Sequence, residues 1–267
     1  MELKMDYENI LVHESPGTLT VTFNRVKHRN TLNDIVLQEL NNVLDLAEEN
    51  SGCRLVILEG QQGIFCTGMD FETFAQHYSQ GDPGTEKISS NLYMSTIRRL
   101  SLIPKVIVSK VDGQVMAGGI GLAAASDLVI ATPRSRFSLS EALWGLLPAM
   151  VAPYLIRRVG YQTAYRMTLT TRPLSAQEAF AAHLVDEVNE NPDAGIRKLK
   201  MKLMRLEEST IGDMKKYFRK MWFINGELEG LAVSETSRLM SLPGVKENIR
   251  NFVEKQQFPW EQKEKNS

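Results

Sequence analysis

The chain has 267 residues, and its 31 Lys and Arg nearly balance its 32 Asp and Glu, which leaves a formal net charge of −1 at pH 7. This balance argues against nucleic acid as a ligand, because affinity for a polyanion depends on an excess of basic side chains. A chain of this length can bury a substantial core, either as one large α/β domain or as a domain with an appendage.

The start of the chain and its most apolar stretches give no targeting or membrane signal. The opening MELKMDYENI is charged throughout, so we expect no signal peptide. The apolar runs at 127–131 and 145–156 fall short of a membrane span. Cys53 and Cys66 lie in apolar surroundings without CxxC spacing, which argues against a disulfide framework and a zinc site. We expect a cytoplasmic protein that binds neither a metal nor a membrane.

Short apolar runs alternate with helical periodicity through the first part of the chain. The turn Ser15-Pro16-Gly17 predicts an opening hairpin, and Asn33 is a plausible N-cap for the helix that follows. Pro148 and Pro153 break the segment that leads to Arg157. The alternation of strands and helices favours an α/β core. Strands are predicted at 10–14, 19–25, 54–60, 64–68, 104–113, 127–133 and 137–141, and helices at 34–50 and 88–103.

The chain changes character at about Pro192. Residues 192–267 have helical periodicity, many charges and Gly or Pro turns, so we predict a helical carboxy-terminal region beside a core at 1–191. Its large apolar side chains indicate core packing or subunit contact rather than a cofactor site. These side chains are Met214, Tyr217, Phe218, Met221 and Trp222.

A glycine-rich stretch, VMAGGIGLAAASD at 115–127, follows a predicted strand and leads into small helix-forming residues. A phosphate cradle is weakly supported, because the spacing is not GxGxxG and a P-loop lysine is missing. An oxyanion hole is the second interpretation, since a backbone amide beside a glycine can closely approach a substrate carbonyl. The turn Thr67-Gly68-Met69-Asp70 could supply a second amide. Close packing between elements would explain the glycines equally well.

Four segments in order resemble the crotonase, or enoyl-CoA hydratase/isomerase, superfamily. The resemblance covers essentially the whole chain, and it implies a spiral of ββα turns with a helical carboxy-terminal region that builds a homotrimer or a dimer of trimers. It also implies acyl thioester substrates, carried on CoA or on the phosphopantetheine arm of a carrier protein. The segments are NRVKHRNTLN (24–33), GIFCTGMDF (63–71), GQVMAGGIGLAAASDLVIA (113–131) and FSLSEALWGLLPA (137–149).

The resemblance assigns roles residue by residue. The two oxyanion-hole amides fall on Met69 and Gly118. The contacts with the thioester arm fall on Lys27 and His28, with Thr67 near the arm. A solvated surface turn explains the two basic residues equally well, because exposed Lys and Arg are common.

One position departs from the hydratases of the superfamily. Their first catalytic glutamate corresponds to Gly121 here, while the second corresponds to Glu141. With an oxyanion hole and one carboxylate, the accessible reactions move a proton at the carbon next to a thioester carbonyl. Return of that proton to a γ-carbon gives an isomerase, and delivery to a β-hydroxyl gives a dehydratase.

The segments 137–179 and QQFPWE (256–261) are similar to the 3-hydroxy-3-methylglutaryl-ACP dehydratases of polyketide β-branching cassettes. That resemblance implies formation of 3-methylglutaconyl-ACP, an acyl carrier protein as partner, and no dissociable cofactor beyond the arm borne by the substrate. The alternatives are an enoyl isomerase, the decarboxylase partner, which needs no carboxylate base, and a non-catalytic acyl-binding trimer.

The implied substrate has a free carboxylate at its far end, so its pocket should hold a cation or several N–H donors. His77, Lys87 and Arg98 lie where the family places the pocket walls, although each is explained as well by an ordinary surface position. The basic residues of 197–205 could meet an acidic carrier protein, although charge runs are usually a solvated helix face.

Overall fold

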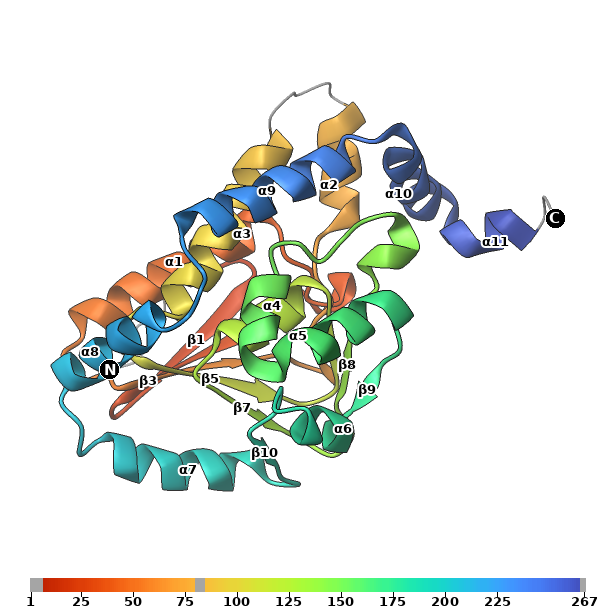
Figure 1. Ribbon diagram of the computed structural model, residues 1–267. Helices are drawn as coiled ribbons and strands as arrows, with labels where there is room; N and C mark the ends of the chain where they lie inside the picture. Colours follow the sequence, from red (N-terminus) through yellow and green to blue (C-terminus); the bar gives the residue numbers. More distant parts are fainter. Residues whose placement is uncertain (1–6, 80–84, 265–267) are drawn as a thin grey trace.

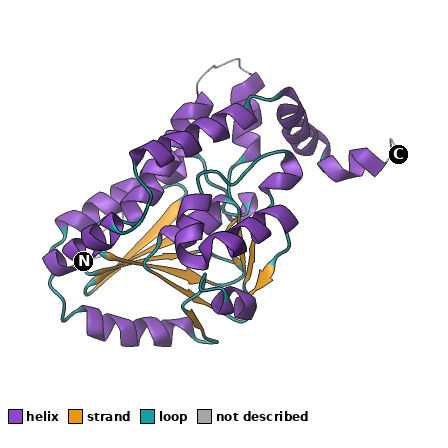
Figure 2. Ribbon diagram, in the orientation of Figure 1, coloured by secondary structure: helices purple, strands orange, loops and turns teal. Residues whose placement is uncertain are grey.

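The computed structural model describes residues 7–79 and 85–264, a mixed α/β arrangement of two sheets surrounded by helices (Figures 1 and 2). The larger sheet has the order β1-β2-β3-β5-β7-β10, and the smaller one has the order β4-β6-β8-β9. The strands are β1 (Ile10–Ser15), β2 (Thr18–Phe23), β3 (Leu55–Glu59), β4 (Ile64–Cys66), β5 (Val106–Val111), β6 (Gln114–Met116), β7 (Leu128–Ala131), β8 (Arg136–Ser138), β9 (Leu174–Ser175) and β10 (Glu187–Val188).

The helices surround the sheets and continue to the end of the described chain. They are η1 (Val26–His28), α1 (Asp34–Glu49), α2 (Phe71–Ser79), α3 (Thr85–Leu100), α4 (Gly118–Ala125), η2 (Glu141–Trp144), α5 (Ala152–Thr170), α6 (Ala176–Ala181), α7 (Pro192–Leu203), α8 (Glu208–Lys220), α9 (Gly226–Met240), α10 (Pro243–Lys255) and α11 (Pro259–Glu264).

Strands follow one another along the chain in pairs, and each pair contributes its first strand to the large sheet and its second strand to the small sheet. β3, β5 and β7 pair in parallel in the large sheet, and β4, β6 and β8, which follow them along the chain, pair in parallel in the small sheet. A helix then carries the chain to the next pair. This is the predicted spiral of ββα turns.

The turn between β5 and β6 depends on Gly113. Its φ is +107°, and a Cβ built there would lie 1.8 Å from the carbonyl oxygen of Gly63. Only glycine combines this φ with such a close approach of two backbones. The chain can therefore cross from the large sheet to the small one within two residues, and the predicted strand ends at Val111.

Alternation along the buried strands divides the apolar core between two faces of the large sheet. Val56 and Leu58 of β3 belong to the main core, whereas Leu55 and Ile57 pack with Ile196 of α7 in a second cluster. Opposite directions of successive side chains produce this division. Helices α1, α3 and α9 lie side by side across the first face, and α7 runs along the other (Figure 1).

Helix α1 begins as predicted, because the Asn33 side chain accepts a hydrogen bond of 3.0 Å from the Val36 N–H. Helix α5 was not predicted. Pro153 lies in its first turn, where a missing N–H breaks no helical hydrogen bond, so a residue taken for a helix breaker stands near a helix start.

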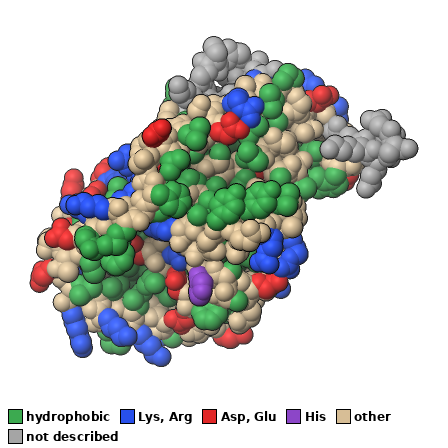
Figure 3. Space-filling view, in the orientation of Figure 1, with side chains coloured by type: hydrophobic (Ala, Val, Ile, Leu, Met, Phe, Trp, Pro, Cys, Tyr) green, Lys and Arg blue, Asp and Glu red, His purple; other side chains and the backbone are tan. Residues whose placement is uncertain are grey.

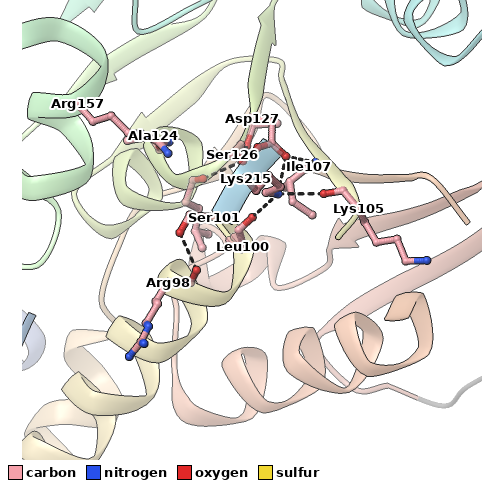
Figure 4. Close-up of polar contacts among 12 residues, drawn as sticks. Arg98, Leu100, Ser101, Lys105, Ile107, Ala124, Ser126, Asp127, Arg157 and Lys215 are labelled. Carbon is pink, nitrogen blue, oxygen red and sulfur yellow. Dashed lines mark hydrogen bonds and ion pairs between the residues drawn. The ribbon is translucent and has the colours of Figure 1, made fainter. Parts of the chain in front are cut away.

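Helix α8 is anchored to the core by a lysine. The Lys215 ammonium donates to the carbonyl oxygens of Leu100 and Lys105 at 3.0 and 2.9 Å and to Asp127 Oδ2 at 2.7 Å (Figure 4). Asp127 also accepts from the Ile107 N–H at 2.7 Å. One side chain therefore ties the carboxy-terminal helices to the segment that follows α4.

The described carboxy-terminal residues are helical from Pro192 to Glu264 with short connections, as predicted for this region. The division into a core at 1–191 and a separate region at 192–267 stays a prediction. Four of the five large apolar residues named for this region are exposed in the single chain, so core packing does not explain them and subunit contact stays a prediction. They are Met214, Tyr217, Phe218 and Met221.

Apolar side chains form patches on the face shown in Figure 3. Helix α5 also exposes large apolar side chains, Tyr161, Tyr165 and Leu169. The trimer expected from the resemblance stays a prediction. Across the described residues, no helix combines the length and the apolar composition needed to cross a membrane.

Candidate active site

The turn after β4 presents the Met69 amide. Gly68 has φ +91°, a conformation that glycine adopts without strain. Its carbonyl accepts from the Leu32 N–H at 2.7 Å, and the Asp70 N–H donates to the Leu32 carbonyl at 3.0 Å. The groups on both sides of Met69 are thus held by one residue, while the Met69 N–H donates to no group among the described residues.

A buried ion pair fixes this turn from behind. Arg25 Nη2 lies 2.7 Å from Asp70 Oδ2, and Arg25 Nη1 donates to the Thr31 carbonyl at 2.7 Å. The other oxygen of Asp70 accepts from the Glu72 and Thr73 N–H groups and caps α2. Burial opposes ionisation of Asp70, but the Thr73 N–H and the Arg25 guanidinium outweigh it and lower the pKa of Asp70.

The second amide, of Gly118, lies at the N-terminus of α4. Ala117, just before it, has φ +48° and ψ −121°, a conformation that costs a non-glycine residue about 1–3 kcal/mol. This strained turn sends the chain from β6 straight into α4. The Gly118 N–H is unpaired within the described residues, as the first N–H of a helix usually is.

The structure brings the two turns into contact. A Cβ built on Gly68 would lie 3.0 Å from the Gly118 nitrogen, and one built on Gly118 would lie 3.5 Å from the Gly68 Cα. Gly119 also has a packing reason to be glycine, because its Cβ would lie 2.5 Å from the Cys66 carbonyl oxygen. The glycines of this stretch therefore allow close packing, and they also bring the unpaired Gly118 amide next to the turn that presents Met69.

Cations hold the other end of α4. Arg157 Nη2 and Arg158 Nε donate to the Ala124 carbonyl at 2.5 and 3.3 Å, and Arg158 Nη2 donates to the Ser126 carbonyl at 2.7 Å. Positive charge at a helix C-terminus complements the helix dipole. The short, buried α4 is thus fixed at its C-terminus while its N-terminal amide stays free.

Glu141 begins η2, beyond β8, which pairs with β6. Its Oε2 is buried and has no hydrogen-bond partner among the described residues. Burial of the carboxylate raises its pKa from the ordinary 4.5 to about 7, against the opposing effect of hydrogen bonds from backbone groups of Glu141 and Ser140. A carboxylate with this pKa can both accept and return a proton near neutral pH.

The three predicted arm residues lie together at the surface next to the Met69 turn. Lys27 and His28 are exposed on η1, and His28 Nδ1 lies 3.3 Å from Glu72 Oε2. The Thr67 hydroxyl donates to the carbonyl of Arg29, the next residue after η1, at 2.9 Å. Contact of these residues with a thioester arm stays a prediction.

Of the three residues named for the distal carboxylate, the structure describes only the side chain of Arg98. Arg98 is 55% exposed and its Nη1 lies 3.5 Å from Glu229 Oε2 of α9, so its guanidinium already has a carboxylate partner. The side chains of His77 and Lys87 lie outside the described residues. The basic helix α7 lies at the opposite end of the molecule from α2 and α10 (Figure 1), which places its charges far from the arm residues.

Sequence reasoning missed Tyr93 of α3. Its hydroxyl donates to the Gly118 carbonyl at 2.7 Å, and its ring lies beside Gly118. Burial raises the pKa of Tyr93 well above its ordinary value, and the nearby charges of Cys66 and Glu141 add to this effect. Helical periodicity marks Tyr93 only as a buried residue of 88–103, so the sequence carries no signal that could have assigned it to the site.

Aromatic packing supports the segment that carries Glu141. Trp144 of η2 makes edge-to-face contacts with Phe71, Phe252 and Trp260, at 4.8, 5.1 and 6.3 Å between ring centroids. The carboxy-terminal helices α10 and α11 thereby pack against the Glu141 segment of their own chain. No cluster of three or more His, Cys, Asp and Glu side chains suited to a metal occurs in the part of the chain that the structure describes.

Residues 13–263 match the family described as enoyl-CoA hydratase/isomerase. The chain belongs to this family. The bacillaene synthase dehydratase PksH of Bacillus subtilis is 36% identical over 96% of this chain and 97% of its own length. The crystal structure of PksH superposes with a TM-score of 0.85 at 35% identity, covering 95% of this chain and all of PksH.

A second relative of this chain is an isomerase. The trans-2-decenoyl-[acyl-carrier-protein] isomerase of Streptococcus mutans is 24% identical over 94% of this chain and 97% of its own length. These comparisons confirm the crotonase fold and an enzyme that acts on acyl thioesters. They also confirm the predicted relation to dehydratases of polyketide biosynthesis.

Proposed function

We propose that this family member dehydrates 3-hydroxy-3-methylglutaryl-ACP to 3-methylglutaconyl-ACP in polyketide β-branching. The observation that carries the proposal is the buried carboxylate of Glu141, whose Oε2 has no hydrogen-bond partner and whose pKa is raised to about 7, in a site whose Met69 and Gly118 amides are unpaired within the described residues. Position 121 offers no second carboxylate.

The proposed reaction uses the two amides and the carboxylate in sequence. The thioester oxygen accepts hydrogen bonds from Met69 and Gly118, which stabilise the enolate that forms when Glu141 removes a proton from C2. The protonated Glu141 then delivers this proton to the C3 hydroxyl. The C3–O bond breaks, water leaves, and the electron pair of the enolate forms the C2=C3 double bond. Glu141 returns to its ionised form.

The tertiary alcohol of this substrate suits a site with one carboxylate. Elimination from a tertiary carbon gives a more substituted, and therefore more stable, double bond than elimination from a secondary one. The similarity to PksH, a dehydratase of bacillaene synthesis, supports both the reaction and a carrier-bound substrate. The exposed Lys27 and His28 beside the Met69 turn suit the charged arm of such a carrier.

An enoyl isomerase is the second candidate. The same Glu141 would return the proton to a γ-carbon, and the similarity to a carrier-protein isomerase favours this alternative. A decarboxylase or a non-catalytic acyl-binding trimer would leave the buried, unpaired Glu141 without a use, so both are weaker proposals.

Intact-protein mass spectrometry of the carrier tests the proposal. We expect the enzyme to convert 3-hydroxy-3-methylglutaryl-ACP to a product lighter by one water, and Glu141→Gln to lose this activity while keeping the wild-type circular dichroism spectrum. Glu49→Gln is the matched control, because Glu49 is exposed at the end of α1. Loss of carbon dioxide, an unchanged substrate mass, or full activity in a folded Glu141→Gln variant would contradict the proposal.

A further inference from the structure

The Tyr93 hydroxyl occupies the space that a side chain at position 121 would need. A Cβ built on Gly121 would lie 1.9 Å from the Tyr93 oxygen and 3.1 Å from Cζ of its ring. The first distance is far inside van der Waals contact, so any side chain at position 121 collides with the hydroxyl. The tyrosine itself is buried, with 7% of its surface exposed. Tyr93 and Gly121 are therefore a matched pair.

The same hydroxyl holds the turn that presents the Gly118 amide. It donates to the Gly118 carbonyl at 2.7 Å. A Cβ on Gly118 would lie 3.5 Å from Cε2 of the tyrosine ring, so the ring also packs against this residue. Because Ala117 just before it is in a strained conformation, the first turn of α4 needs such contacts to keep one geometry.

Tyr93 also adds no charge beside Glu141. Burial, together with the neighbouring Cys66, Glu141 and Tyr154, raises the pKa of Tyr93 well above its ordinary value, so it stays a neutral hydroxyl. A carboxylate in its place would repel ionised Glu141 and separate the pKa values of the two acids.

We propose that Tyr93 is a positioning residue: its hydroxyl fixes the Gly118 turn and, with Gly121, closes the space that a second carboxylate would need. This proposal deepens the proposed function and rests on it for the reaction that is measured. Tyr93 acts through Gly118 rather than through a step of its own.

A double-mutant cycle tests the matched pair without any substrate. We expect Gly121→Ala to lower the unfolding temperature by about 5 °C, because an added methyl group forces apart well-packed atoms. When Tyr93→Phe is combined with Gly121→Ala, the colliding oxygen is absent, and part of this loss should be recovered; the ring Cζ at 3.1 Å and Val151 Cγ2 at 3.2 Å stay close to the new methyl group. Gly230→Ala is the control, since a Cβ there meets nothing within 4 Å. If Gly121→Ala lowers the unfolding temperature equally in the wild-type and the Tyr93→Phe backgrounds, the two residues are not coupled and the proposed pair is wrong.

Kinetics on the carrier-bound substrate test the positioning role. Tyr93→Phe keeps the ring and removes the hydrogen bond to Gly118, so we expect kcat to fall roughly tenfold, about the worth of one such bond, with KM changed less than twofold. A loss of folded protein would instead appear as a lower unfolding temperature with an unchanged rate per folded molecule. An unchanged kcat, or a change confined to KM, would overturn the role.

The two experiments separate the proposals. If the wild-type enzyme releases no water from 3-hydroxy-3-methylglutaryl-ACP, the proposed function fails, while the stability cycle still decides the Tyr93–Gly121 pair. If the wild-type enzyme is an active dehydratase and the cycle shows no coupling between positions 93 and 121, the proposed Tyr93–Gly121 pair is wrong, while the proposed dehydration is supported.

Discussion

Arg25 and Asp70 form a buried ion pair, with 2.7 Å between Nη2 and Oδ2, directly behind the turn that presents the Met69 amide. Their side chains are 11% and 5% exposed. Removal of one member of such a pair leaves the other charged and buried, which destabilises a protein by about 3–5 kcal/mol. The pair thus links the stability of the fold to the position of the amide.

We expect Arg25→Met to lower the free energy of unfolding by roughly 3 kcal/mol and to reduce kcat more than KM, because Asp70 loses the partner that fixes the Met69 turn. Urea denaturation and single-turnover rates would measure the two effects. Arg134→Met is the control, since Arg134 and Asp112 pair at the surface, with 67% and 39% exposure, and such pairs contribute about 1 kcal/mol or less. Equal losses in both variants would contradict this role of Arg25.

The pKa of Glu141 predicts the pH dependence of the reaction. A base must be ionised to accept a proton, so kcat/KM should rise with pH and level off above an inflection near 7, the pKa to which burial raises Glu141. An inflection below pH 5 would show that the catalytic base is an ordinary exposed carboxyl.

The same pKa shift predicts a pH-dependent stability. Folding favours the protonated form of Glu141, so this contribution is fully present below pH 4.5 and is lost as the pH rises through about 7. Glu141→Gln removes the buried charge. At pH 8 we expect this variant to exceed the wild type in free energy of unfolding by on the order of 2 kcal/mol, with the difference absent at pH 4. Thermal unfolding at both pH values checks the sign.

The Gly118 amide can be removed without removing the residue. Gly118→Pro deletes the N–H at the first position of α4, where a helix tolerates proline, and we expect kcat to fall on the order of 10²-fold or more. Gly118→Ala keeps the amide, and its Cβ would make ordinary contacts of 3.5 Å with Gly68, Leu32 and Tyr93. The alanine variant should therefore stay far more active. Equal rates in the two folded variants would place the oxyanion hole elsewhere.

Charge reversal at the surface tests the arm residues. Lys27→Glu should raise KM for the carrier-bound substrate about fivefold with little change in kcat, and added salt should narrow the difference, because an exposed charge acts at long range. Lys198→Glu changes the other basic surface that the sequence offers to a carrier protein, the exposed face of α7, and we expect it to leave KM unchanged. If both variants raise KM equally, a general charge effect is responsible and the arm assignment is wrong.

Local pattern was sufficient for most of the fold and insufficient where a residue's role depends on a distant partner. Short apolar runs identified seven strands, and Asn33 marked the start of α1, because these signals lie within a few residues. The short strands β6, β9 and β10 were not predicted. Helix α5 was missed, since Pro153 breaks helices in the interior but is accepted in a first turn.

The sequence by itself determined the family, the positions of Met69, Gly118 and Glu141 within its motifs, and the absence of a carboxylate at Gly121. Only the tertiary structure decided what stands in that place. Tyr93 reaches Gly121 because α3 packs against α4, and helical periodicity cannot distinguish a tyrosine in the core from one that faces a turn of another helix. The pKa of Glu141 likewise depends on its burial, which raises it to about 7 and which the sequence motif around Glu141 does not record.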